Sequence, residues 1–194
     1  MKHIVLVAFD RFTDIDLFLA WDLFRRIDAA RCDVRIVAKN PRITSSTGIT
    51  IDCHGPLAAA READAVYFCS GQGSRALADD PEFADAVRLD ESRQVLAAID
   101  SGAILLGALG HLHGRRATTY PSPDLRTRLL AAGATPVDAA LVTEGNVATA
   151  AQCLAGVELV RWVITRLFDR SVADATIATA APLGAHGDAR GADL

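Results

Sequence analysis

Two patterns of apolar residues alternate along the chain. Unbroken apolar runs, typical of buried parallel strands, occupy residues 4–9, 65–69 and 95–99, and residues 34–38, interrupted only by Arg35, are predicted to form a further strand. Apolar residues at helical spacing occupy residues 16–27, 81–89, 101–110, 125–132 and 154–168. Strands that alternate with helices predict a mostly parallel sheet covered by helices on both faces, which is an α/β fold.

Two further segments indicate antiparallel pairs. Residues 43–53 are rich in Thr and Ser and broken by Gly48, which predicts a hairpin or exposed ribbon. Residues 137–143 and 147–149 flank a Glu-Gly-Asn turn, a second hairpin signal. With no internal repeat, these patterns predict one domain over residues 1–182. Residues 183–194, mostly Gly, Ala and Asp, are predicted to form a flexible tail.

Composition narrows the class of protein. A chain of 194 residues with 51% hydrophobic residues suits one domain with a sizeable core. A net charge of −4 gives no general attraction to nucleic acid or anionic membrane, and no apolar run reaches membrane-spanning length. Four cysteines without a CxxC pair indicate reduced thiols in a cytoplasmic protein. We expect no nucleic-acid or membrane partner, no cofactor and no metal.

Asp100 is the first candidate for chemistry. It ends the apolar run 95–99 and precedes Ser101, where a helix of small and apolar residues opens. Such a strand-to-helix turn lifts its corner side chain to the carboxyl end of the sheet, beside the free N–H groups of the helix start. Open α/β sheets bind ligands at that edge. A second loop, residues 70–73, follows a buried strand, and its glycines let N–H groups turn towards a ligand.

The order of segments and three motifs resemble the ThiJ/PfpI superfamily, and within it most of all the isocyanide hydratases. The motifs are Gly110-His-Leu-His-Gly-Arg-Arg-Ala-Thr-Thr119, Ala78-Asp-Asp-Pro-Glu-Phe83 and Glu144-Gly-Asn-Val-Ala-Thr149. The similarity runs from Lys2 to about Ala181. This resemblance implies a flavodoxin-like, class I glutamine amidotransferase-like sandwich, a small-molecule substrate, and a homodimer with each pocket near the interface.

The chain departs from the family where the chemistry is expected. Family members carry a reactive cysteine at the corner, in a Cys-Thr-Gly-Ala sequence, whereas this chain reads Asp-Ser-Gly-Ala from Asp100. Tyr120 stands where the family has a histidine, Pro121 where a tryptophan often follows, and Ser70 where a proline opens the Gly-rich loop. Because several pocket positions differ together, natural divergence explains them better than one engineered change.

The resemblance also assigns candidate site residues. Asp16 matches the carboxylate that approaches the cysteine in the hydratases, although capping of its helix is the alternative role. The N–H groups of Gly71 and Ser101 would form an oxyanion hole. Further candidates for substrate binding are Gln72, Tyr120 and Trp21. Core packing is the alternative role for Trp21, and burial with a satisfied hydroxyl is the alternative for Tyr120.

Three roles are open to Asp100: a helix cap in a degenerate protein, an acid–base group paired with Asp16, or a carboxylate nucleophile. Two close carboxyls cannot both ionise easily, so one would stay protonated near neutral pH. Cys153 is a minor alternative nucleophile, and Cys69 is expected in the core. We interpret His111 and His113 as surface residues and Arg115 with Arg116 as a solvated pair.

Two functions follow from these residues. The first is a hydratase-like or lyase-like enzyme that uses Asp16 and Asp100 for hydration, dehydration, isomerisation or cyclisation of a small uncharged molecule. The second is a non-catalytic member of the superfamily that binds a ligand or regulates. Protease and deglycase activities, which depend on the cysteine, are disfavoured.

Overall fold

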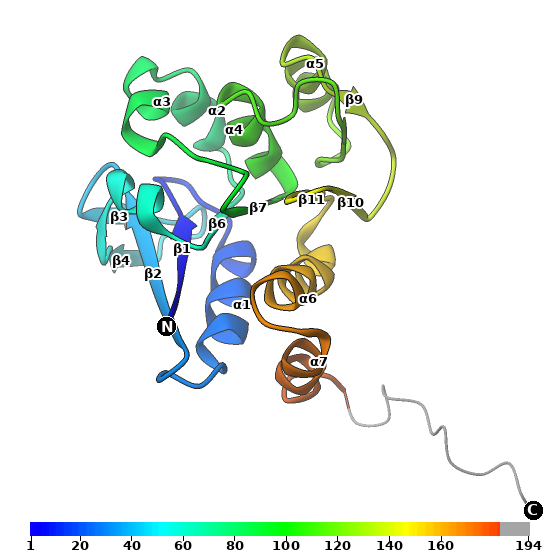
Figure 1. The fold of residues 1–194 in the computed structure, drawn as a ribbon. Coiled ribbons are helices and arrows are strands. Elements are labelled where there is room, and N and C mark those ends of the chain that lie inside the picture. The colour runs from blue at the N-terminus through cyan, green and yellow to red at the C-terminus, as the bar shows by residue number, and fades with distance from the viewer. Residues whose placement is uncertain (183–194) are drawn as a thin grey trace, which may run out of the picture.

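A twisted, mostly parallel sheet forms the centre of the protein (Figure 1). The computed structural model describes residues 1–182; the predicted tail, residues 183–194, lies outside them. In the order in which they pair, the strands of this sheet are β10 (Leu141–Glu144), β11 (Val147–Ala150), β7 (Val95–Ile99), β6 (Ala65–Phe68), β1 (Lys2–Val7), β2 (Cys32–Ala38) and β5 (Gly55–Pro56). Only the β10–β11 pair is antiparallel within this sheet.

Helices cover both faces of the sheet, so the predicted α/β sandwich is confirmed (Figure 1). One face carries α1 (Asp14–Arg25), α6 (Gly156–Leu167) and α7 (Arg170–Ala178). The other carries α2 (Ser74–Ala78), α3 (Pro81–Val87), α4 (Ala103–Ala108) and α5 (Pro123–Ala131). Three short 3-10 helices, η1 (Leu57–Glu62), η2 (Asp100–Gly102) and η3 (Cys153–Ala155), complete the chain's helical segments within residues 1–182.

The apolar patterns explain these layers. Every residue of β6 and β7 is buried, as a strand covered on both faces must be. The residues of α6 that face the sheet, Leu159, Val160, Val163 and Ile164, recur at helical spacing and are buried. Asp80 caps α3 by accepting a hydrogen bond from the N–H of Glu82 at 3.0 Å.

Two small sheets lie outside the main one. The Thr- and Ser-rich segment forms the predicted hairpin, β3 (Arg42–Thr44) with β4 (Thr50–Asp52). The predicted strand 137–143 is wrong in its first half, because only Leu141–Glu144 joins the main sheet. The chain before it pairs elsewhere: β8 (Arg116–Ala117) runs parallel to β9 (Thr135–Pro136), and the N–H of Val137 donates to the carbonyl of Ala117 at 2.9 Å.

Unusual backbone conformations gather at the carboxyl edge of the main sheet. Three of the four non-glycine residues with positive φ among residues 1–182 follow strands there: Arg11 after β1, Asp100 after β7 and Gln152 after β11. Gln152 has φ 64° and ψ 153°, a region almost reserved for glycine and costing about 1–3 kcal/mol. Strain of this kind accumulates at sites that hold side chains in fixed positions.

Within residues 1–182, every helix is too short or too polar to span a membrane.

Candidate active site

The corner after β7 holds Asp100 in a left-handed conformation, with φ 53°. The N–H of Ser101 donates to the Asp100 carboxylate, and the hydroxyl of Thr119 donates to the Asp100 carbonyl at 2.8 Å. The turn fits closely against the end of β6, because a Cβ on Gly102 would lie 2.6 Å from the carbonyl oxygens of Phe68 and Cys69. Glycine at this position therefore lets the corner approach the neighbouring strand.

Asp16 lies in the first turn of α1 and is only 1% exposed. The hydroxyl of Ser70, the residue after Cys69 at the end of β6, donates to Oδ2 of Asp16. The hydroxyl of Tyr67 reaches the Asp16 carbonyl at 3.4 Å. Within residues 1–182, Oδ1 of Asp16 has no hydrogen-bond partner. Within the described residues, only one of the two oxygens of this nearly fully buried carboxylate therefore accepts a hydrogen bond.

The structure brings Asp16, Asp100 and Cys153 together. One carboxylate oxygen of each aspartate and the Sγ of Cys153 all lie within 4.8 Å of one another. The three residues come from α1, from the corner after β7 and from η3 after β11. A separation of this size lies within the few ångströms over which charged groups shift each other's pKa.

Burial dominates the electrostatics of this cluster. It raises the pKa of Asp100 from 3.8 to about 6; the charge of Asp16 adds to the rise, while the Ser101 N–H and the charge of Arg75 oppose it. Burial also raises the pKa of Asp16, against hydrogen bonding from Ser70 and the nearby Cys153 thiol. The Cys153 thiol has its pKa raised to about 12 by burial and by the two aspartates.

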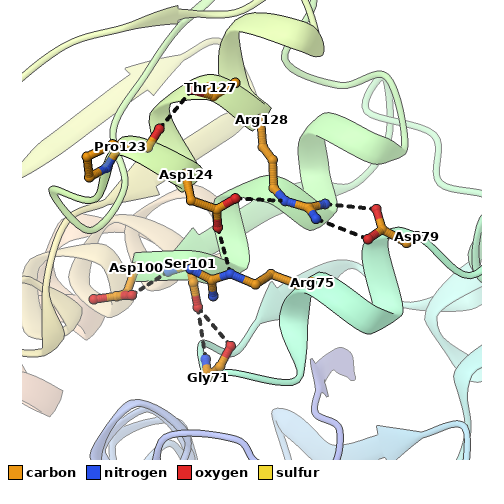
Figure 2. A network of polar contacts seen from close by, with 9 residues as sticks. All are labelled: Gly71, Arg75, Asp79, Asp100, Ser101, Pro123, Asp124, Thr127 and Arg128. Atoms are coloured by element: carbon orange, nitrogen blue, oxygen red, sulfur yellow. Dashed lines mark hydrogen bonds and ion pairs between the residues drawn. The ribbon is translucent and has the colours of Figure 1, made fainter.

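Arg75 belongs to a chain of ion pairs beside the corner (Figure 2). Its Nε contacts the carboxylate of Asp124 at 2.7 Å, and Arg128 contacts the same carboxylate at 3.5 Å. Arg128 also pairs with Asp79 at 2.8 Å. The chain links α2 to α5, so the positive charge of Arg75 is held in place near Asp100.

Both N–H groups predicted to form an oxyanion hole already have acceptors in the protein. The N–H of Gly71 donates to the Ser101 hydroxyl at 2.9 Å, and that hydroxyl lies 3.2 Å from the Gly71 carbonyl (Figure 2). The N–H of Ser101 donates to Asp100. A substrate oxyanion would have to displace both of these acceptors.

The other predicted substrate-binding residues have their own neighbours. Trp21 stacks on His54, with ring centroids 5.1 Å apart. Gln72 accepts a hydrogen bond from Arg11 and lines a cavity of about 290 Å³. Tyr120 is 48% exposed, which excludes the buried alternative for it. It lines a cavity of about 310 Å³ that also contacts Thr119, and Thr119 is bonded to the corner.

The expectation of a solvated basic pair is wrong for Arg115 only, because Arg116 is exposed. Arg115 is not solvated: its guanidinium makes bonds of 2.6 and 2.7 Å to the two carboxylate oxygens of Glu91. His111 contacts the same carboxylate at 3.1 Å and is mostly buried. The ion pair with Arg115 is the main reason that the pKa of Glu91 falls to about 2. The carboxylate partner was missed because Glu91 lies 20 residues from His111 and 24 residues from Arg115 in sequence.

Sequence reasoning also missed two residues that support the corner. Ser70 entered as the first residue of the loop 70–73 and as a departure from a family proline, with no role for its side chain, yet its hydroxyl holds Asp16. Thr119 entered only as part of a motif, yet it fixes the corner carbonyl. The signal for Ser70 was its place directly after a buried strand, where a hydroxyl faces the same sheet edge as the corner.

The fold defines a flavodoxin-like α/β protein, with the candidate site at the strand-to-helix corner. Residues 2–166 match the DJ-1/PfpI family, to which the chain belongs. Over 118 residues it is 30% identical to an isonitrile hydratase from Pseudomonas putida, a match that covers 60% of this chain and 50% of that protein. The chain therefore matches half the length of this curated relative.

Solved structures give the same fold. A ThiJ/PfpI family protein from Pseudomonas syringae superposes with a TM-score of 0.83 and 25% identity, covering 96% of this chain and 79% of that one. Drosophila melanogaster DJ-1beta superposes with a TM-score of 0.80 and 22% identity, covering 92% of this chain and 97% of that one.

Proposed function

We propose that the protein is an enzyme in which Asp16 and Asp100 perform acid–base chemistry on a small uncharged molecule. The observation that carries this proposal is the pair of buried carboxylates with oxygens within 4.8 Å of each other at the sheet edge. Two such groups favour a state with one proton between them. That state can donate a proton to one substrate atom and accept a proton from another.

The surroundings suggest different roles for the two acids. Asp16 is the more buried and is fixed by Ser70, whereas Asp100 is 9% exposed and adjoins half-buried Cys153. Asp100 is therefore the group better placed to reach a substrate, with Asp16 as its proton partner. The site concentrates negative charge, which favours neutral substrates over anions. Hydration, dehydration, isomerisation and cyclisation all fit this pairing.

A cysteine nucleophile is disfavoured by the chemistry of the available thiols. Cys153 has its pKa raised to about 12, so its thiolate is scarce at neutral pH. Cys69 is fully buried, and burial raises its pKa well above the usual range of a thiol. The route that depends on a corner cysteine is therefore not part of the proposal.

The second candidate, a non-catalytic ligand-binding or regulatory protein, has one observation in its favour. The N–H of Gly71 donates to the Ser101 hydroxyl, and the N–H of Ser101 donates to the Asp100 carboxylate, so both N–H groups already have acceptors in the protein. Hydrogen bonds that satisfy the N–H groups of the corner within the protein are expected if Asp100 is only a helix cap.

The test compares Asp16→Asn and Asp100→Asn with the unmodified protein. Small neutral compounds, isonitriles included, are incubated with protein in D2O, and proton NMR follows both turnover and deuterium incorporation. We expect each variant to lower turnover by about 10²–10⁴-fold. Asp14→Asn, on the same helix turn, is the matched control and should keep full activity. Turnover that survives in both variants would exclude the acid–base role.

Asp100→Cys separates the two candidates. This change restores the family's corner residue, but Tyr120, Pro121 and Ser70 still differ from the family pattern. Catalytic groups need placement within about 0.5 Å, so we expect no efficient isonitrile hydration. Robust hydration by the Asp100→Cys protein would mean that the pocket remains a hydratase pocket and that the unmodified chain is a disabled enzyme.

We also propose that the protein is a homodimer in a cytoplasmic setting. Ile15 and Ile49 are about half exposed, and their segments are joined by a hydrogen bond from Thr47 to Asp14 at 2.8 Å. This apolar surface at the start of α1 supports self-association. Four free cysteines fit a reducing compartment. Sedimentation of Ile15→Glu should give a monomer, and an unchanged mass would refute this surface.

A further inference from the structure

The carboxylate cluster has the composition of a metal site as well as that of a proton site. Asp16, Asp100 and Cys153 offer two oxygens and one sulfur within 4.8 Å of one another. Each comes from a different element, and all three meet where the strands β7 and β11 end. A cluster of acids alone is common at protein surfaces, so a further observation is needed.

That observation is the unpartnered oxygen of Asp16. This side chain is 1% exposed and its residue belongs to the cluster, yet its Oδ1 accepts no hydrogen bond of normal geometry among residues 1–182. The neighbouring Cys153 thiol, a weak donor that lowers the pKa of Asp16, is itself a member of the cluster. A buried charged acceptor without a partner costs at least about 1–3 kcal/mol. A cation placed among the three side chains would remove this cost and offset the repulsion between the two carboxylates.

The donor set selects the kind of cation. Ca²⁺ and Mg²⁺ prefer shells of oxygen atoms, whereas a thiolate with carboxylates suits Zn²⁺. Zinc bonds of about 2.3 Å to sulfur and about 2.1 Å to oxygen place tetrahedral ligands about 3.4–3.6 Å apart. Atoms that lie at most 4.8 Å apart need to approach each other by no more than about 1.4 Å to reach that spacing. Three protein ligands leave a fourth position for water, as in catalytic zinc sites.

We propose that Asp16, Asp100 and Cys153 bind one Zn²⁺ ion. On binding, the S–H bond of Cys153 breaks, a Zn–S bond forms and the proton passes to solvent. The ion takes the space between the two carboxylates, so zinc binding and proton exchange exclude each other. Zn²⁺ should therefore inhibit the enzyme, a consequence that rests on the proposed function, whereas the binding of Zn²⁺ does not.

The test uses untagged protein that has been stripped with EDTA and dialysed. Calorimetric titration with Zn²⁺ against a competing chelator should give one ion per chain. Co²⁺ in place of Zn²⁺ should give a thiolate-to-cobalt charge-transfer band in the near ultraviolet. Both signals should be lost in Cys153→Ser, with a fall in affinity beyond the about 10–100-fold that outer-shell changes cost. Cys53→Ser, another half-buried cysteine, should leave both signals unchanged.

Asp100→Asn guards against misfolding as the explanation, because we expect this variant to be more stable than the unmodified protein at neutral pH. It too should lose the ion. Absence of binding by the unmodified protein, full binding by Cys153→Ser, or an equal loss in Cys53→Ser would overturn the proposal. Because these signals need no turnover, a failed acid–base function and a failed zinc site give different results.

Discussion

Replacement of Asp100 by Asn should stabilise the protein, and only above about pH 3.8, where Asp100 of the unfolded chain is charged. The folded protein raises the pKa of this carboxyl from 3.8 to about 6, so folding favours the protonated acid. The stability from this group is fully present below about pH 3.8 and is lost as the pH rises through about 6. At about 1.36 kcal/mol per pH unit, the loss above pH 6 is about 3 kcal/mol.

Asn is a close mimic of the protonated acid. It has the same size, accepts the hydrogen bond from the Ser101 N–H, and tolerates the left-handed backbone with φ 53°. The variant should therefore match the unmodified protein near pH 4 and exceed it by about 3 kcal/mol at pH 8. For a chain of this length that gain corresponds to about 6–12 °C in Tm.

Urea unfolding of both proteins at several pH values between 4 and 8, with EDTA present, measures this difference. Asp14→Asn is the matched control with the opposite sign. Although burial raises the pKa of Asp14, hydrogen bonds from Ser45 and Thr47 lower it overall. Removal of this carboxylate should therefore destabilise the protein at neutral pH, and the effect should shrink as the pH falls through the lowered pKa. A gain for Asp100→Asn that is constant with pH, or a loss at pH 8, would refute the reasoning.

Three further changes test the supports of the site. Ser70→Ala removes the hydroxyl that holds Asp16 and should lower the free energy of unfolding in urea by about 1–3 kcal/mol. Ser74→Ala is the control: its buried hydroxyl has no partner within residues 1–182, so the free energy of unfolding should change little. Gly71→Ala should destabilise the protein by more than about 2 kcal/mol, because the φ of 142° is strained for alanine and the Cβ would lie 2.3 Å from a carbonyl oxygen. An unchanged Tm of this variant would contradict the prediction. Alkylation of Cys153 by iodoacetamide at pH 7, followed by mass spectrometry, should be slow because its pKa is about 12, and rapid labelling would show a lowered pKa.

The sequence predicted the sheet well because its strands are buried on both faces. The run 95–99 matches β7 at both ends, since burial demands apolar residues throughout. It did not predict α7, whose segment from Arg170 is short and rich in polar residues and is held by packing on α1 and α6. Five-residue α2 was also missed, since one helical turn carries too little periodicity.

The candidate site was predictable only in part. Asp100 could be found from its place after a buried strand, and Asp16 only from the resemblance to a family. The Cys153 thiol, too, was expected near the pocket only from the resemblance, because its position depends on the pairing of β11 with β7. The bond from Ser70 to Asp16 joins residues 54 apart and depends on how α1 packs at the end of β6.

The pairing of β11 with β7 determines which mutations the site can tolerate. Ala150 lies opposite Ile99 in the parallel register, so Asp100 and the segment leading to Cys153 leave the sheet side by side. Deletion of one residue within β11 would move Cys153 by about 3.3 Å along the strand and turn the β11 side chains to the opposite face. A substitution at the corner leaves these main-chain bonds untouched. During divergence of the family, the corner side chain can therefore be exchanged while the number of residues in the strands beside it stays fixed.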